Sequence, residues 1–329
     1  MRHDRSAAQA GGEGTSVLET TTASFVELRD LLFSVVYNLL GTVSDTEDVL
    51  QDTWLAWASS GREEVVNARA YLLRIAVNQA LSRLRSARRS REAYVGPWLP
   101  EPLATGTDGP ESAERAEAVS MAMLVVLETL TPLERTVFVL HEVFGYDHPE
   151  IATVLGRSPA AVRQLAHRAR EHVRARRPRY QPDPSARRAA TERFLAAALG
   201  GDLHALLEVL APDVTLWSDG GGKLGLARRV IQGRDKVARL LVAGAARYPT
   251  ADLVIDYAEV NGGPAALLFT GGKLFGVVVV DLTEQGDRVR AVYSVVNPDK
   301  LTALAGSVDL TVAISVAPIR ASRASMGPA

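Results

Sequence analysis

Residues 96–103, GPWLPEPL, divide the chain into parts that fold separately. Proline lacks a backbone N–H and fixes φ, so the three prolines of this segment end any helix that reaches it. A flexible linker is rich in glycine and serine, whereas this one carries Trp98, Leu99 and Leu103. Side chains of this size are unfavourable in water, so we expect Trp98 and Leu99 to dock on a folded surface. Packing of Trp98 on the following helix alone is the simpler alternative.

The 329 residues suffice for two or three domains, each with its own core. The chain has no cysteine, which excludes disulfides and suits a reducing cytoplasm. No apolar run reaches the roughly 18 residues of a membrane helix. The N-terminal residues 1–23 lack the apolar stretch of a signal peptide, so we expect a disordered leader on a cytoplasmic protein without membrane contact.

The net charge of −1 conceals a strong segregation of charge along the chain. Residues 26–64 hold eight Asp and Glu against two Arg. Residues 69–92 hold seven Arg against one Glu, and residues 163–179 again hold seven Arg against one Glu. The net charge therefore does not argue against nucleic-acid binding, because the basic residues are concentrated in two segments.

Residues 24–93 have the pattern of a helical domain. Apolar side chains from Leu28 to Leu39 recur at the i, i+3, i+4, i+7 spacing of one buried helix face. Gly41 ends this helix, and a capping box from Ser44 to Glu47 is expected to open the next one. The second helix leaves several polar side chains outside, namely Asp45, Asp48, Gln51 and Asp52.

A third helix is expected over residues 68–91, with a polar stripe along one side. At 100° per residue, five of its side chains fall within roughly 100° of each other. They are Arg74, Asn78, Arg85, Arg88 and Arg89. Such a stripe suits contact with a nucleic-acid backbone, although a solvated face that only confers solubility is equally compatible with the pattern.

Residues 113–180 predict a second helical domain that contains a helix-turn-helix. Asp147 and Glu150 cap a short helix, Gly156 makes the turn, and Ser158 caps a second helix. The second helix is expected to bury Val162, Leu165, Ala166, Ala169 and Val173. The side chains that can reach base edges and phosphates in a major groove are Arg157, Ser158, Arg163, Gln164, His167 and Arg168. An ordinary helical hairpin in a bundle is the alternative.

After residue 185 the order of elements changes to a mixture of helices and strands. The expected elements are helices at 187–199 and 202–210, a strand at 214–219, a helix at about 233–246, and strands at 253–260, at 266–282 with a glycine break, and at 288–296. This order predicts an α+β cone with a curved, mostly antiparallel sheet folded over helices. The complete expected division is leader 1–23, domain 24–93, linker 94–112, domain 113–180, domain 186–305 and tail 306–329.

Several motifs together resemble a known family. VSDTEDVLQDTWLAW and AYLLRIAVNQALSRLRSARR resemble region 2 of extracytoplasmic-function sigma factors, and LTPLERTVFVLHEVFGYDHPEIATVLGRSPAAVRQLAHRARE resembles region 4. The last third is similar to a SnoaL-like domain, and WLPEP, DGGGK and NPDKL are signatures of the sigma-J type. The resemblance implies two all-α sigma domains, the second with a helix-turn-helix, followed by an α+β SnoaL-like cone.

The resemblance implies roles for the charged surfaces. The core RNA polymerase would be bound by Asp45, Glu47, Asp48, Gln51 and Asp52. The −10 element of promoter DNA would be melted and held by Arg74, Asn78, Arg85, Arg88 and Arg89, with Asn78 near a flipped base. The −35 element would be read as duplex by Arg157, Ser158, Arg163, Gln164, His167 and Arg168.

The resemblance also suggests where the hydrophobic linker docks. The expected regulatory contact comprises Trp98, Leu99, Pro100, Asp219, Gly220, Gly221, Gly222, Lys223, Asn297, Pro298, Asp299, Lys300 and Leu301. A linker gripped in this way would let the C-terminal domain modulate the sigma factor in cis. The alternative function is a helix-turn-helix regulator fused to an enzymatic or ligand-binding SnoaL-like domain.

Other chemistry finds little support in the sequence. SnoaL-like folds host enzymes, and Asp219, Asp256, Tyr257, Tyr293 and Trp217 are the candidates to line a cavity, but their spacing does not place them together. DGGGK lacks the spacing of a phosphate-binding loop, so a tight turn is expected. The six histidines form no metal-ligand pattern. We therefore expect no catalysis, cofactor or metal, and an unknown small-molecule ligand of the cone stays open.

Overall fold

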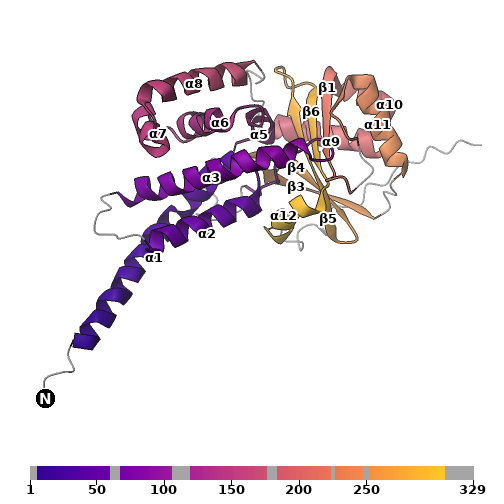
Figure 1. Ribbon diagram of the computed structural model, residues 1–329. Helices are drawn as coiled ribbons and strands as arrows, with labels where there is room; N and C mark the ends of the chain where they lie inside the picture. Colours follow the sequence, from indigo (N-terminus) through magenta and orange to yellow (C-terminus); the bar gives the residue numbers. More distant parts are fainter. Residues whose placement is uncertain are drawn as a thin grey trace, which may run out of the picture. The chain divides into compact units, whose positions relative to one another are not determined.

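The computed structural model describes residues 6–59, 67–105, 119–175, 184–223, 227–247 and 252–307 (Figure 1). Contacts divide these residues into two compact units. The first unit contains the described residues up to 89 and those from 127 to 173. The second contains residues 90–105, residues 119–126 and all described residues from 174 onward. No helix within the described ranges is long and apolar enough to cross a membrane.

The first unit is helical. Its elements are α1 (Ser6–Leu40), α2 (Val43–Ser59), α3 (Ala68–Glu92), α6 (Pro132–Phe138), the π-helical turn η2 (Val139–Val143), α7 (His148–Leu155) and α8 (Pro159–Arg174). Helix α1 starts at Ser6, so residues 6–23 continue a helix where a disordered leader was expected. Helix α2 starts at Val43, before the predicted capping box at Ser44, and Thr42 Oγ1 donates to Asp45 Oδ2 over 2.6 Å.

The helix-turn-helix predicted from the capping residues is confirmed. The Asp147 side chain accepts from the backbone N–H of Glu150, whose carboxylate accepts from Asp147 N–H in return. Gly156 ends α7 with φ 62°, the left-handed conformation that glycine adopts without strain. Helix α8 buries the five side chains that its periodicity predicted, which are Val162, Leu165, Ala166, Ala169 and Val173.

The second unit is an α+β domain with a six-stranded sheet. Its helices are α5 (Met121–Leu127), α9 (Pro184–Leu199), α10 (Leu203–Val209), α11 (Arg234–Arg247), the 3₁₀ turn η3 (Pro298–Lys300) and α12 (Thr302–Ser307). Its strands are β1 (Leu210–Asp219), β2 (Ile231–Gln232), β3 (Leu253–Val260), β4 (Gly263–Thr270), β5 (Lys273–Leu282) and β6 (Val289–Val295). They lie in the order β2-β1-β6-β5-β4-β3. Residues 308–329, most of the expected tail, lie outside the described residues.

The sheet is mostly antiparallel, as expected, and it contains one parallel pair. Strand β1 pairs with β6 in parallel, so the sheet is mixed, while its other pairs are antiparallel. The glycine break expected within 266–282 divides the segment into two strands, because Gly271 and Gly272 turn the chain at φ 54° and 72°. Two consecutive residues with positive φ make the two-residue turn of a β-hairpin, so β4 and β5 are antiparallel neighbours. Helix α5, expected in the second sigma domain, packs with the strands.

Both faces of the sheet are buried. Successive strand side chains point to opposite faces, and in β5 Val278 and Val280 pack in a core with α9, α10 and α11, while Val277 and Val279 face the other side. For this reason the sequences of the strands are nearly continuous apolar runs. The second face is covered by Leu99 and by side chains of α5 and α12.

The helix-covered core predicts a contrast between two leucines. Leu206 of α10 is fully buried there, whereas Leu240 of α11 is 40 % exposed. We expect Leu206→Ala to lower the free energy of unfolding of the second unit by about 2–5 kcal/mol, since it leaves a cavity. Leu240→Ala should change it by less than about 1 kcal/mol. Urea denaturation followed by circular dichroism measures both, and equal effects would contradict this core assignment.

Candidate nucleic-acid interface and linker site

The linker is anchored on a buried carboxylate of the second unit. Asp219, at the end of β1, is fully buried. Its Oδ1 accepts from the Tyr94 hydroxyl over 2.5 Å, and its Oδ2 accepts from the backbone N–H of Leu99 over 2.8 Å. Lys300 Nζ of η3 lies 2.7 Å from Oδ2 and 2.5 Å from the carbonyl oxygen of Leu99. One carboxylate and one ammonium group therefore bind both backbone groups of Leu99, and we call this arrangement the linker node.

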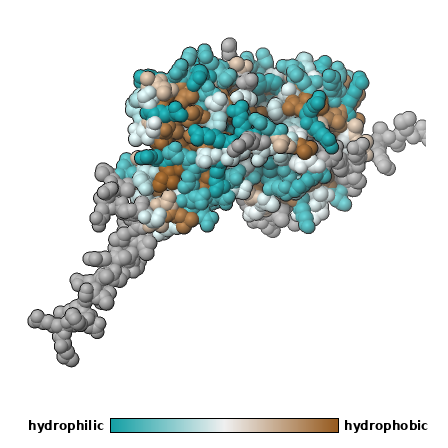
Figure 2. All heavy atoms as spheres, in the orientation of Figure 1, coloured by the Kyte–Doolittle hydropathy of each residue, from teal (hydrophilic) through white to brown (hydrophobic). Residues whose placement is uncertain are grey.

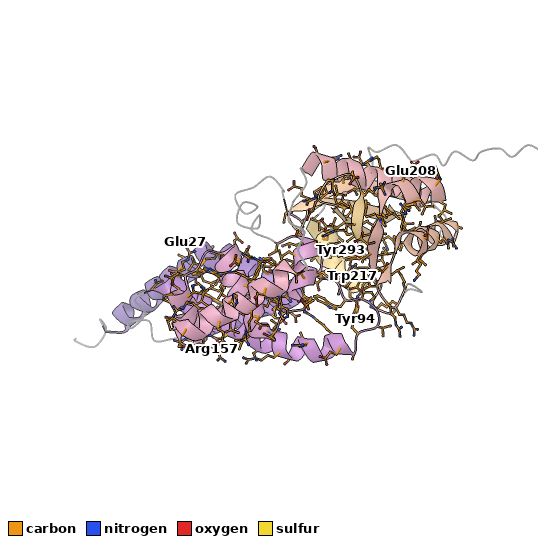
Figure 3. All side chains as sticks on the ribbon, turned by 90° about the horizontal axis from the view of Figure 1, so that it is seen from above. Glu27, Tyr94, Arg157, Glu208, Trp217 and Tyr293 are labelled. Carbon is orange, nitrogen blue, oxygen red and sulfur yellow. The ribbon has the colours of Figure 1, made fainter. Side chains whose placement is uncertain are left out.

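Two aromatic side chains of the linker surround the ammonium group of Lys300. Its Nζ lies 4.2 Å from the ring centroid of Trp98 and 5.0 Å from that of Tyr94, distances at which cations are attracted to aromatic faces. The guanidinium group of Arg91 also lies over the Trp98 ring, 3.6 Å from its centroid. Trp98 thus contacts the C-terminal part of the chain and not only its neighbours in sequence. Figure 3 labels Tyr94 on this unit, together with Trp217 and Tyr293.

Burial changes the proton affinities in the linker node. Burial, reinforced by the neighbouring Asp219 carboxylate, raises the pKa of Tyr94 well above its usual 10.0. The phenol therefore stays protonated and acts as a donor. Burial lowers the pKa of Lys300 from 10.5, and the attraction of Asp219 opposes this change. The node thus depends on the ion pair to keep a buried ammonium group charged.

The glycine-rich motif DGGGK is a turn that brings the backbone close to other segments. Gly221 and Gly222 have φ of 61° and 73°. A Cβ on Gly221 would lie 2.6 Å from the Asn297 amide, and one on Gly222 would lie 3.0 Å from Val95 of the linker. The exposed pair of Lys223 and Asp299 closes the turn at 2.5 Å. The expected tight turn is confirmed, and the glycines are needed for close approach.

The NPDKL segment supplies the other side of the node. Asn297 caps η3, because its side-chain oxygen accepts from the backbone N–H of Asp299 over 3.2 Å. Its Nδ2 donates to the Tyr94 hydroxyl over 2.9 Å. Leu301, buried on the second face of the sheet, fixes the end of the segment. The structure thus brings WLPEP, DGGGK and NPDKL together in one place.

A second anchor, which no motif indicated, holds the far end of the linker. Ala104 forms an isolated antiparallel bridge with Val260, and Thr105 N–H donates to Glu259 O over 2.9 Å. Asn261, in the β3–β4 turn with φ 51°, donates its N–H to Leu103 O over 2.8 Å. The only sequence signal for this turn was the Asn-Gly pair at 261–262, which is typical of hairpins.

The residues considered for catalysis do not converge. Trp217 and Tyr293 lie on the second face of the sheet, with ring centroids 6.4 Å apart. Tyr257 packs against the helix-covered core on the opposite face. Asp256 precedes it in β3 and so points to the other side. Asp219 is already committed to Lys300. Among the described residues, no group of three or more acidic or histidine side chains could hold a metal ion.

The predicted reading face of the helix-turn-helix is open to solvent. The six predicted side chains are all exposed: Arg157, Ser158, Arg163, Gln164, His167 and Arg168. Arg157 points away from the helical unit in Figure 3. The Ser158 hydroxyl accepts from the N–H of Ala161 over 3.2 Å and caps α8. Arg168 lies 3.5 Å from Glu134, so part of its charge is already paired.

The predicted acidic residues line α2, but several are paired within the unit. Glu47, Asp48, Gln51 and Asp52 are exposed and Asp45 is half-buried. Arg83 of α3 contacts Asp48 at 2.9 Å and Asp52 at 3.0 Å, and Arg29 contacts Glu47 at 2.7 Å.

Sequence periodicity missed an apolar extension of this face. Leu55 is 58 % exposed and follows Asp48, Gln51 and Asp52 at the i+3, i+4, i+7 spacing of one face. Val26 of α1 is 62 % exposed, and Figure 2 shows hydrophobic atoms among hydrophilic ones on the surface of the helical unit. Leu55 therefore adds apolar surface next to the acidic residues of α2.

The stripe predicted on α3 is exposed where the structure describes it. Arg74, Asn78, Arg85 and Arg88 are exposed, and the side chain of Arg89 lies outside the described part. Asn78 Nδ2 donates to Arg74 O over 2.7 Å and to Val154 O of α7 over 3.0 Å. The stripe therefore meets the helix-turn-helix at Asn78.

The linker node predicts unequal effects for two lysines. In Lys300→Met the buried Asp219 loses its charged partner, which should lower the free energy of unfolding by about 3–5 kcal/mol. Lys223→Met breaks a pair whose side chains are 51 % and 67 % exposed, and it should cost at most about 1 kcal/mol. Adding Asp219→Asn to Lys300→Met should cost less than the sum of the single changes. Urea denaturation tests the cycle, and strict additivity would rule out the coupling.

Comparisons with known proteins agree with this geometry. The sequence matches the family models "Sigma-70 region 2" over residues 25–90 and "Sigma-70, region 4" over residues 120–173. The ECF RNA polymerase sigma factor SigJ of Mycobacterium tuberculosis is 39 % identical over 292 residues, which cover 85 % of this chain and 93 % of that protein. The probable ECF sigma factor SigI of the same species is 29 % identical over 290 residues, or 87 % and 96 % of the two chains.

A solved structure extends the likeness through the C-terminal domain. The crystal structure of the Mycobacterium tuberculosis extracytoplasmic function sigma factor SigJ matches with a TM-score of 0.67 and 36 % identity. The match covers 86 % of this chain and 98 % of that one, so it extends through the C-terminal α+β domain. The chain therefore belongs to the ECF RNA polymerase sigma factors, which bind core RNA polymerase and promoter DNA, the latter through the helix-turn-helix of region 4, and direct transcription initiation.

Proposed function

We propose that this sigma factor divides its contacts among three surfaces. The face of α2 with Asp45, Glu47, Asp48, Gln51 and Asp52 binds core polymerase, extended by the exposed Leu55. The α3 stripe of Arg74, Asn78, Arg85, Arg88 and Arg89 holds the −10 element, and the exposed face around α8 reads the −35 element. The separation of acidic and basic surfaces supports this division, because the enzyme and its template then attract different parts of the chain.

We further propose that the C-terminal domain modulates initiation in cis through its grip on the linker. The observation that carries this proposal is the linker node, where Asp219 and Lys300 bind the backbone of Leu99. Recognition of the Leu99 backbone by a buried ion pair favours one position of the linker, since the next residue, Pro100, has no N–H to donate to Asp219.

Binding of the linker to the C-terminal domain limits the distances that can separate the two DNA-binding regions. The segment between α3 and α5 runs from residue 93 to residue 120, and residues 94–105 of it are held against the domain. A chain held at both ends of a segment has fewer accessible end-to-end distances than a free one. The domain thereby restricts the promoter spacings that regions 2 and 4 can bridge.

The C-terminal domain performs this role without catalysis. The core between the sheet and α9–α11 is built from apolar side chains. Asp256, Tyr257 and Tyr293, the groups considered as acids or bases, lie on different faces of the sheet. Because the protein acts together with core polymerase, we propose that it is cytoplasmic. A small molecule that changed the linker node would act as a signal, not as a substrate.

Promoter reading predicts unequal effects for two arginines of α8. Arg163 is exposed on the proposed reading face, whereas Arg170 contacts Glu142 at 2.6 Å within the same region. Arg163→Ala should weaken binding of a −35 duplex by about 1–3 kcal/mol, and Arg170→Ala should weaken it less. Fluorescence anisotropy at a fixed salt concentration measures both affinities. Equal losses would contradict the assignment of the reading face.

Linker control predicts a change in spacer selectivity. In vitro transcription with core polymerase is measured on promoters whose −35 and −10 elements differ in separation by single base pairs. Release of the linker by Lys300→Met or Trp98→Ala should reduce output at the preferred spacing by at least about threefold and flatten the dependence on spacing. Lys223→Met is the matched control and should keep the parental profile. Parental profiles in all three variants would refute control through the linker.

A further inference from the structure

The C-terminal domain contains a third basic segment, comparable to the two that are proposed to bind DNA. Residues 223–247 hold seven Lys and Arg against one Asp. Residues 69–92 and 163–179, which contribute to the α3 stripe and the reading face of α8, have the same ratio of basic to acidic side chains. A surface that serves only solubility carries both signs of charge interspersed. The third segment therefore calls for a binding partner that is negatively charged.

Two pairs of cations in this segment are open to solvent and are held by neighbouring structure. Arg228 and Arg229 precede β2, whose Ile231 packs against the helix-covered core. Lys236 and Arg239 lie three residues apart on α11, so they share one face of that helix. All four cationic side chains are exposed, and we call them the basic patch.

The charges of the basic patch are not neutralised within the protein. None of the four side chains forms an ion pair with a residue that the structure describes. By contrast, Lys223 lies 2.5 Å from Asp299, and Arg188 lies 3.1 Å from Glu192. A cation without a neighbouring carboxylate is available to an anion from outside. The four charges of the patch also outnumber the carboxylate of Asp235, the one acid in the segment.

The basic patch lies close to the chain that leaves α3. A Cβ on Gly96 would lie 3.9 Å from the Cα of Arg228, so the linker backbone passes beside this residue. Gly96 is four residues beyond Glu92, the last residue of α3, and both belong to the second unit. Four extended residues span at most about 14 Å. The end of the helix proposed to hold the −10 element is therefore within about 20 Å of Arg228.

The dimensions of the basic patch suit a short length of DNA backbone. From Arg229 the chain passes through β2 and Gly233 into the first turn of α11. At about 3.4 Å per extended residue and about 1.5 Å per helical residue, Arg229 and Lys236 are at most about 20 Å apart. Each strand of duplex DNA carries a phosphate about every 3.4 Å along the axis. Both pairs of cations can therefore reach the phosphates of about six base pairs.

We propose that the basic patch binds the phosphate backbone of promoter DNA beside the −10 element. Contacts of this kind position DNA without reading its sequence. The C-terminal domain is tethered to both DNA-binding regions, so DNA held by either region is presented to the patch at a high effective concentration. The proposal rests on the proposed role of α3 only for the position of the patch along the promoter. It adds a direct DNA contact to the linker-based role of the same domain.

The dependence of binding on salt counts the phosphates that the patch neutralises. Binding of the full chain to a duplex of about 40 base pairs of random sequence is measured by fluorescence anisotropy between about 50 and 200 mM salt. Arg228→Gln with Arg229→Gln removes two charges, and so does Lys236→Gln with Arg239→Gln. Each double variant should reduce the slope of log K against log salt by about 1.8, since each phosphate contact contributes about 0.9.

A matched control separates phosphate contact from net charge. Lys273→Gln with Arg288→Gln removes the same charge beside the two turns that flank β5, which β1 and β6 separate from β2. This control should leave the slope within about 0.5 of the parental value. Equal reductions in the control and in the patch variants overturn the proposal, and so do parental slopes in both patch variants. If one patch variant loses the circular dichroism of the parent, the other decides.

A further double variant separates this proposal from the proposed function. Arg157→Gln with Arg163→Gln removes two charges from the reading face of the helix-turn-helix. A lower slope in this variant, with parental slopes in both patch variants, overturns the patch and leaves the proposed function intact. Lower slopes in the patch variants alone support the patch and contradict the reading face. Weaker binding of core polymerase by the patch variants, with parental DNA slopes, assigns the patch to a protein partner and also overturns the proposal.

Discussion

A carboxylate placed out of water determines the arrangement of the C-terminal half of this protein. Asp219 is satisfied by Lys300, by the Tyr94 hydroxyl and by the N–H of Leu99, which belong to three separate segments. An ion pair removed from water contributes little net stability compared with apolar packing, but it penalises every arrangement that leaves one charge alone. The node therefore mainly determines the position of the linker, and the packing of the apolar side chains around it supplies most of the stability.

The apolar packing that holds the linker involves a sheet that is covered on both faces. One face packs on α9, α10 and α11, as in an ordinary two-layer α+β domain. The other face is covered by Leu99 of the linker, Met121 of α5 and Leu304 of α12. Because α5 opens region 4, the same hydrophobic surface receives the connection between the two sigma regions and the start of the second one. Regulation and folding thus use the same contacts.

Features set by neighbouring residues were mostly predicted correctly, the capping box at Ser44 excepted, and pairing between distant segments was predicted less well. The caps of α7, the turn at Gly156 and the buried side of α8 follow from side chains a few residues apart. The parallel pairing of β1 with β6 depends on tertiary packing, and the glycine break at 271–272 did not by itself identify a hairpin. The linker motifs were found through family resemblance, whereas the Tyr94 hydroxyl contacts Asp219 and Asn297, which are so distant in sequence that no local pattern indicates the contact.

The second face of the sheet also determines what counts as a domain in this molecule. Leu99 and Met121 precede α9, yet they complete the core of the strands that follow it. A fragment that stops before α9 would leave both side chains facing solvent, and an isolated C-terminal fragment would have a bare apolar sheet. Such pieces are prone to self-association, so their behaviour mixes loss of regulation with aggregation. The linker, α5 and the strands therefore form a single folding unit.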